Sequence, residues 1–256
     1  MEIIKKYIYL SWMDLKQICT FKFILASTVI GILIIVIPGS TMMNKDNTFY
    51  SLYINNSVSE FFRGYLQLLM VFYGIVFSAY LSLNYSQLIY SIHDTMLLTG
   101  RVTRKELINT RVCSTFIIIF FVMGIHWLEV MGFVLYKELP VSARLLIRYC
   151  IYIGIDMCII TNMSIFVYII SKNRLISFVP IIALGLITLA SANNVSFGIF
   201  SLLFTFSSEN YYSNDYSSFM NINSSWVIQL ILIGVFWLVS ICMYERGDIY
   251  KEKNLL

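Results

Sequence analysis

Residues 93–111 read HDTMLLTGRVTRKELINTR, and they separate two long apolar runs of the chain. Four of these residues are Lys or Arg, and the part before Gly100 contains few helix breakers. Gly commonly follows the end of a helix. Thr103 and Glu106 then have the spacing of a capping box, in which two side chains bond the free backbone N–H groups at a helix start. The segment therefore predicts a short helix, a break, and a new helix after Thr103.

The composition of the whole chain indicates a membrane protein. Of the 256 residues, 59% are hydrophobic and only 12% are charged, whereas soluble domains have roughly 45–50% hydrophobic residues. We therefore expect an all-α membrane protein that forms one domain over residues 1–256, with no separate soluble domain. The net charge of +4 is spread along the chain, so no nucleic-acid partner is expected.

Six apolar segments are long enough to cross a membrane. A helix that spans about 30 Å of hydrocarbon needs about 20 mostly apolar residues. The predicted spans are residues 21–38, 65–83, 112–136, 145–171, 175–192 and 226–244. The fifth of them contains Pro180, a residue type that membrane helices tolerate better than soluble helices do.

The distribution of Lys and Arg predicts that both termini are cytoplasmic, because cytoplasmic loops carry the excess of these residues. With the N-terminus inside, only five of the 18 Lys and Arg residues fall outside: Lys45, Arg63, Lys137, Arg144 and Arg148. The loop at 84–111 then lies in the cytoplasm, where its basic residues meet anionic lipid headgroups. Holding this loop inside is the simplest explanation of its charge, but it does not explain the helix, break and cap.

Two segments outside the spans have a pattern of their own. Residues 1–19 carry an apolar row at helical spacing, which predicts an amphipathic helix in the cytoplasmic membrane interface; the alternative is a cytoplasmic extension of the first span. The row is Ile4, Ile8, Trp12, Leu15 and Cys19. The outer loop 193–225 contains FGIFSLLFTF at 197–206, which is too short to span. It predicts a re-entrant outer helix or an ordinary linker.

Three ionisable side chains fall inside the predicted spans. His126 and Glu129 are three residues apart and share one helix face, and Asp156 lies near the middle of the fourth span. Charges at this depth are costly and face protein or water, so these residues either contact cargo, relay a proton or form a gate, or they simply pair with neighbouring helices. No metal site is expected, because the five cysteines form no CxxC pair and no HExxH segment occurs.

The segment Asp94 to Leu107, DTMLLTGRVTRKEL, resembles the cytoplasmic loop of type-2 ABC transporter permeases. In that family an acidic residue begins a short coupling helix, and a basic-basic-Glu segment opens the third span. The resemblance implies that one group of residues contacts an ATPase: Asp94, Thr95, Met96, Leu97, Leu98, Gly100 and Arg101. It implies that a second group forms the hinge: Thr103, Arg104, Lys105 and Glu106. Many members have Glu in place of Asp94 and Pro in place of Arg101 or Val102.

The resemblance also implies the partners. The chain has no GxxxxGK[ST] segment, so it is not expected to be an enzyme or to bind a cofactor itself. Two copies of a separate ATPase subunit, holding ATP and Mg²⁺, and a second permease would complete an exporter in the plasma membrane. The cargo implied is amphiphilic: a peptide, an antimicrobial of the lantibiotic kind, or a lipid-like molecule. The chain is rich in Ile, Asn, Lys, Tyr and Ser, a composition that AT-rich genes produce. This bias suggests a Gram-positive bacterium of low GC content.

Two other functions remain open. An ion-coupled secondary transporter would use Asp156 and Glu129, although such folds often show internal repeats and none is evident between residues 1–136 and 137–256. A membrane sensor or partner protein without transport would have no associated ATPase.

Overall fold

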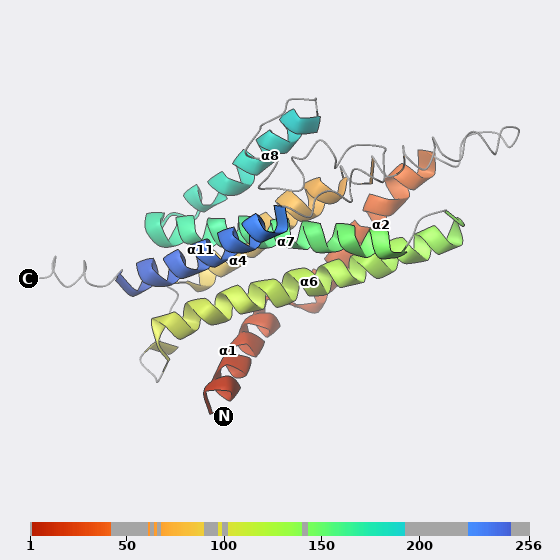
Figure 1. The fold of residues 1–256 in the computed structure, drawn as a ribbon. Helices are drawn as coiled ribbons and strands as arrows, with labels where there is room; N and C mark the ends of the chain where they lie inside the picture. The colour runs from red at the N-terminus through yellow and green to blue at the C-terminus, as the bar shows by residue number, and fades with distance from the viewer. Residues whose placement is uncertain are drawn as a thin grey trace, which may run out of the picture.

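The computed structural model describes residues 2–41, 61, 64–65, 68–89, 97–98, 102–139, 143–192 and 225–246, and the fold is given for these residues (Figure 1). All regular structure in this part of the chain is helical. The α-helices are α1 (Glu2–Ile18), α2 (Phe21–Thr41), α4 (Ser78–Leu88), α6 (Arg104–Tyr136), α7 (Ala143–Ser171), α8 (Val179–Ala192) and α11 (Ser225–Arg246). A π-helix, η1 (Met70–Phe77), leads into α4, and a 3₁₀ turn, η2 (Ile176–Phe178), leads into α8.

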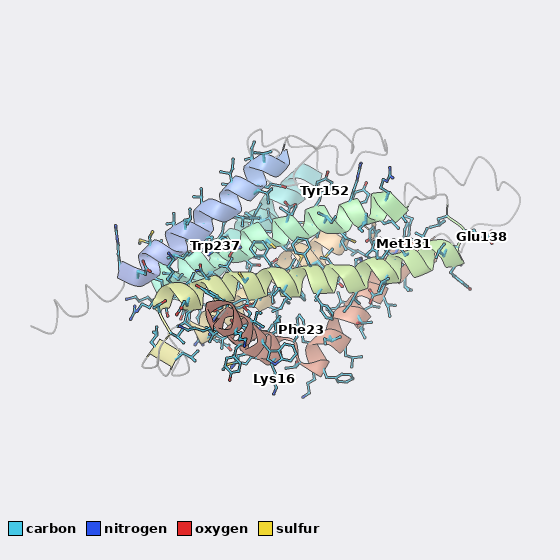
Figure 2. The ribbon with its side chains drawn as sticks, turned by 60° about the horizontal axis from the view of Figure 1, so that its bottom comes forward. Lys16, Phe23, Met131, Glu138, Tyr152 and Trp237 are labelled. Atoms are coloured by element: carbon cyan, nitrogen blue, oxygen red, sulfur yellow. The ribbon has the colours of Figure 1, made fainter. Side chains whose placement is uncertain are left out.

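The bundle is built around α7. Of an apolar run of 18 residues within Leu146–Ser171, 78% are buried, against 28–39% for the corresponding runs in the other long apolar helices. Helices α6, α11, α4 and α8 all pack against α7, while α1 and α2 pack against α6. Figure 1 shows α6 and α7 lying side by side along the length of the bundle. In Figure 2, α1 crosses the first turns of α6, and Glu138 lies at the opposite end of that helix.

In the part of the chain that the structure describes, four helices are long and apolar enough to cross a membrane: Phe21–Gly39, Arg104–Tyr136, Leu146–Ser171 and Val227–Arg246. They correspond to the first, third, fourth and sixth of the predicted spans. Many of their large apolar side chains are exposed, as lipid contact requires. These four helices suggest a multi-pass membrane protein and agree with the expected all-α class.

The prediction of six spans is wrong for the described residues. The region of the second predicted span is helical, but its hydrogen bonding changes from the π pattern to the α pattern at Ser78. The fifth begins with the 3₁₀ turn and continues as α8, which has only 14 residues. Pro180 is the second residue of α8 and follows the 3₁₀ turn directly, so it lies in the first turn of the α-helix, where proline is tolerated. It marks the start of a helix rather than a position inside a span.

The bounds of the predicted elements differ in two further places. A helix is present in the segment 1–19, as α1 (Glu2–Ile18). Helix α6 begins at Arg104, directly after the predicted cap and eight residues before the predicted span 112–136, because the capped segment and the apolar segment form one continuous helix. Helix α4 continues through Leu88, so the loop predicted from residue 84 starts later. The outer helix predicted at 197–206 lies outside the described residues.

Candidate functional site

The start of α6 is held by the predicted capping box. The Thr103 Oγ1 accepts a hydrogen bond from the Glu106 backbone N–H at 3.3 Å. The Thr103 backbone N–H in turn donates to Glu106 Oε2 at 2.7 Å. Two of the free N–H groups at this helix start are thereby satisfied. The sequence prediction of a cap at this position is confirmed.

The same turn of α6 contacts both ends of the described chain. Lys6 of α1 forms an ion pair with Glu106, with 2.6 Å between Nζ and Oε2. Arg104 donates from Nη1 to the Tyr244 carbonyl of α11 at 3.2 Å, and its guanidinium lies 5.4 Å from the centroid of the Tyr244 ring. Two of the four predicted hinge residues, Arg104 and Glu106, therefore contact α11 and α1, Thr103 caps the helix, and Lys105 is exposed.

The residues expected to contact an ATPase precede this turn. Leu97 and Leu98 are helical and partly exposed, which agrees with a short helix in the loop. Asp94, Thr95, Met96, Gly100 and Arg101 lie outside the described residues.

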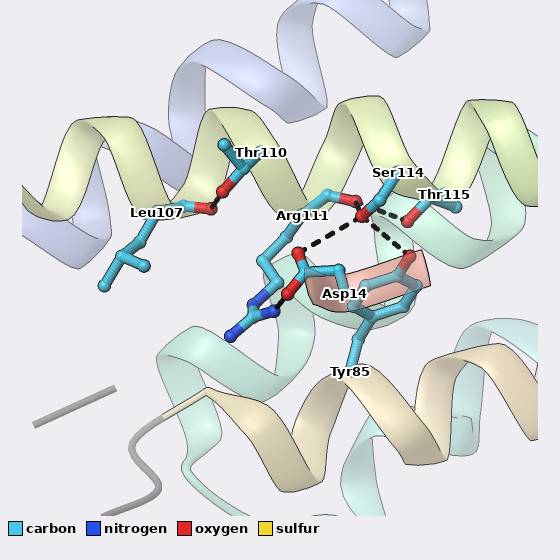
Figure 3. A network of polar contacts seen from close by, with 7 residues as sticks. All are labelled: Asp14, Tyr85, Leu107, Thr110, Arg111, Ser114 and Thr115. Atoms are coloured by element: carbon cyan, nitrogen blue, oxygen red, sulfur yellow. Dashed lines mark hydrogen bonds and ion pairs between the residues drawn. The ribbon is translucent and has the colours of Figure 1, made fainter. Parts of the chain in front are cut away.

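A buried ion pair between α1 and α6 was missed in the sequence. Arg111 pairs with Asp14, and their side chains are 1% and 4% exposed. Figure 3 shows Ser114 beside them: its hydroxyl lies 3.3 Å from Asp14 Oδ2 and 2.9 Å from the Tyr85 hydroxyl of α4. The network therefore joins α1, α4 and α6. The signal in the sequence was the helical spacing of Asp14, which lies four residues from the apolar residues Leu10 and Ile18. Both of these residues are buried in the structure.

His126 and Glu129 come together as predicted, on the side of α6 that faces α2. The distance between His126 Nδ1 and Glu129 Oε2 is 3.2 Å. The other ring nitrogen, Nε2, lies 3.0 Å from the hydroxyl of Tyr65. The imidazole is fully buried, whereas the Glu129 side chain is 12% exposed. The His126 imidazole is thus closed off from the surroundings, whereas the Glu129 side chain has limited access to them.

Asp156 belongs to a different contact. It is fully buried on α7, and its Oδ1 accepts a hydrogen bond of 3.0 Å from the Gln229 Nε2 of α11. The contact joins two of the four long apolar helices, as the structural interpretation of an intramembrane carboxylate requires. Within the described residues, no group of three or more His, Cys, Asp and Glu side chains could hold a metal ion.

Comparisons with protein-family models, with curated proteins and with solved structures find no match for this chain.

Proposed function

We propose that this chain is the membrane-spanning permease subunit of an ATP-driven ABC exporter. In this proposal a separate ATPase subunit, present in two copies and holding ATP and Mg²⁺, binds the cytoplasmic loop before α6. A second permease completes the transport path in the plasma membrane. The cargo is an amphiphilic molecule, such as a peptide, an antimicrobial or a lipid-like compound, and the orientation keeps both termini in the cytoplasm.

The observation that carries the proposal is the position of the α6 start. A helical pair, Leu97 and Leu98, precedes it in the loop, and the capped turn itself is bonded to α1 through Glu106 and to α11 through Arg104. A force applied to the loop is therefore passed to three helices at once. Networks of hydrogen bonds and ion pairs of this kind carry energetic coupling between distant parts of a protein.

Affinity purification tests the proposal. The tagged chain is isolated from its native membrane in mild detergent, and the proteins that accompany it are identified. We expect an ATP-binding subunit at a near one-to-one ratio. The double variant L97E/L98E places two charges on the expected contact and should lose this subunit while the chain still inserts into the membrane.

The matched control is L175E. Leu175 is 78% exposed and follows α7, on the side of the membrane where Lys172 and Arg174 are expected to be cytoplasmic. This variant should keep the ATPase. Purification of the wild-type chain without any ATP-binding subunit, or equal retention in L97E/L98E and L175E, would contradict the proposal.

The buried ionisable side chains favour a second candidate, an ion-coupled transporter. Asp156 and His126 are both fully buried within long apolar helices, where charged groups often serve ion pathways. Vesicle assays distinguish the two functions. Uptake driven by an imposed ion gradient without ATP, and lost in D156N, supports the ion-coupled candidate; uptake that needs ATP and the partner supports the exporter.

A further inference from the structure

The imidazole of His126 is enclosed by hydrogen-bonding groups on both of its nitrogens. Nε2 faces the Tyr65 hydroxyl at 3.0 Å, and Nδ1 faces Glu129 Oε2 at 3.2 Å. The Tyr73 ring of η1 closes a third side, with 5.0 Å between the ring centroids. His126 is 0% exposed, and Tyr65 and Tyr73 are 1% and 2% exposed. Tyr65, His126 and Glu129 thus form a continuous hydrogen-bonded row inside the bundle.

Helix α2 makes room for this row by having a glycine opposite it. A Cβ atom on Gly31 would lie 1.9 Å from Glu129 Oε2 and 3.0 Å from His126 Nδ1. No side chain other than hydrogen fits there without displacing the carboxylate. The second carboxylate oxygen, Glu129 Oε1, is buried and has no hydrogen-bond partner. A carboxylate in these surroundings needs a compensating positive charge, because its burial among apolar helices is otherwise expensive.

We propose that His126 and Glu129 form a one-proton binding site, with the bound proton held on the imidazole. Without this proton, the Tyr65 hydroxyl donates to Nε2, Nδ1–H donates to the Glu129 carboxylate, and the site carries one negative charge. The proton adds to Nε2, the new N–H donates to the Tyr65 oxygen, and an imidazolium–carboxylate pair of zero net charge results. Only the hydroxyl hydrogen of Tyr65 has to turn, because both states use the same heavy-atom positions.

Among the described residues, the other titratable groups around the site are tyrosines, one cysteine and two arginines. Helix α2 contributes none between Phe23 and Thr41. The described residues from Phe61 to the start of α4 contribute two tyrosines, Tyr65 and Tyr73. Helix α7 brings Tyr149 and Cys150 into electrostatic range of Tyr65, and its first two turns also carry Arg144 and Arg148. Tyrosine and cysteine are neutral in the ordinary pH range, and the arginines keep their charge.

The position of the site connects protonation to the contact between α2 and α6. Glu129 lies seven residues before Tyr136, which is about 10 Å from the end of the helix. The Glu129 side chain is 12% exposed, so the site is not completely enclosed. Loss of the proton leaves an uncompensated carboxylate directly against Gly31 and weakens the α2–α6 contact. This inference goes beyond the exporter proposal and does not depend on it.

The chain contains only two histidines, His93 and His126, which makes a direct measurement possible. The full-length H93Q chain, labelled with ¹⁵N-histidine and placed in lipid bilayers, reports His126 alone by nitrogen NMR across a pH series. We expect reversible conversion between a neutral imidazole and an imidazolium with two ring protons. Replacing the carboxylate in E129Q should lower the imidazolium-to-neutral ratio at a given pH about tenfold or more, because the imidazolium loses the opposite charge beside it.

Two glycine variants keep the test independent of the glutamate itself. G31A adds a methyl group that must push the carboxylate away from the imidazole, so the ratio should fall in the same direction as in E129Q. G124A is the matched control, because nothing lies within 4 Å of a Cβ placed at Gly124 on the same helix as His126; it should leave the ratio unchanged. An imidazole that stays neutral throughout the series in the folded chain, or a ratio that E129Q does not change, would overturn the proposal.

Discussion

At the scale of single residues, Arg111 places a charged side chain in the interior of the bundle. Arg111 is the largest fully buried side chain among the described residues, and taking its guanidinium out of water carries a desolvation penalty of several kcal/mol. The penalty is offset by Asp14, whose carboxylate also accepts a hydrogen bond from the Ser114 hydroxyl. Such a pair adds little net stability but makes the docking of α1 specific, because only one position of α1 brings the two charges together.

The variant D14N tests this argument. Removing the negative charge leaves the buried guanidinium of Arg111 without its ionic partner, so the free energy of unfolding in detergent micelles should fall by about 3–5 kcal/mol. The double variant D14L/R111M removes both charges and should recover most of that loss. A double variant as unstable as D14N would show that the packing of α1, rather than its charge, is what matters.

The capping box predicts a smaller effect at Thr103. The variant T103A removes the acceptor for the Glu106 N–H and should lower the free energy of unfolding by about 1 kcal/mol. Hydrogen exchange should become faster in the first turn of α6 and stay unchanged in its middle. T103S keeps the acceptor oxygen and should behave like the wild type. Equal exchange rates in T103A and T103S would argue against a role for the cap.

At the scale of the helices, the sequence was informative wherever the signal is local. The cap at Thr103 and the helix at 1–19 follow from residues within a few positions of each other, and both are present. The change from π to α hydrogen bonding at Ser78 and the short α8 were not predicted, because apolar composition does not report the hydrogen-bond pattern. The Asp14–Arg111 pair depends on how α1 packs against α6, which periodicity alone does not determine.

The contact between α11 and α6 gives a prediction at this scale. Trp237 Nε1 donates to Asn109 Oδ1 at 2.8 Å, next to the capped turn. Hydrogen bonds between membrane helices contribute about 0.6 kcal/mol on average and about 1.7 kcal/mol at most. We therefore expect W237F to lower the free energy of unfolding by about 0.6–1.7 kcal/mol. It should also speed hydrogen exchange at the end of α11. W12F is the control, because Trp12 is 63% exposed on α1; equal effects of both variants would exclude a specific role for the Asn109 bond.

At the scale of the whole molecule, the polar contacts are distributed unevenly along the bundle. The capped turn of α6, the Asp14–Arg111 pair and the Arg104–Tyr244 contact gather where α1, α6 and α11 meet. The His126–Glu129 pair lies further along α6, against α2. The excess of Lys and Arg predicts that the end with α1 is cytoplasmic. In our two proposals, the ATPase acts at the end with α1, and the proton-binding pair lies closer to the other end.

Cysteine labelling of intact cells tests this orientation. In a chain whose five native cysteines are replaced by alanine, Y136C and L175C mark the ends of α6 and α7, and the native side chains at these positions are 77% and 78% exposed. Their similar exposure makes access to the reagent the main difference between them. A membrane-impermeant maleimide should label Y136C directly and L175C only after the membrane is permeabilised, because Lys172 and Arg174 hold the latter end inside. Labelling of both positions from outside would exclude a membrane-crossing α7. Labelling of L175C from outside and of Y136C only after permeabilisation would show the opposite orientation. The loop before α6 would then lie outside, where a cytoplasmic ATPase does not reach it.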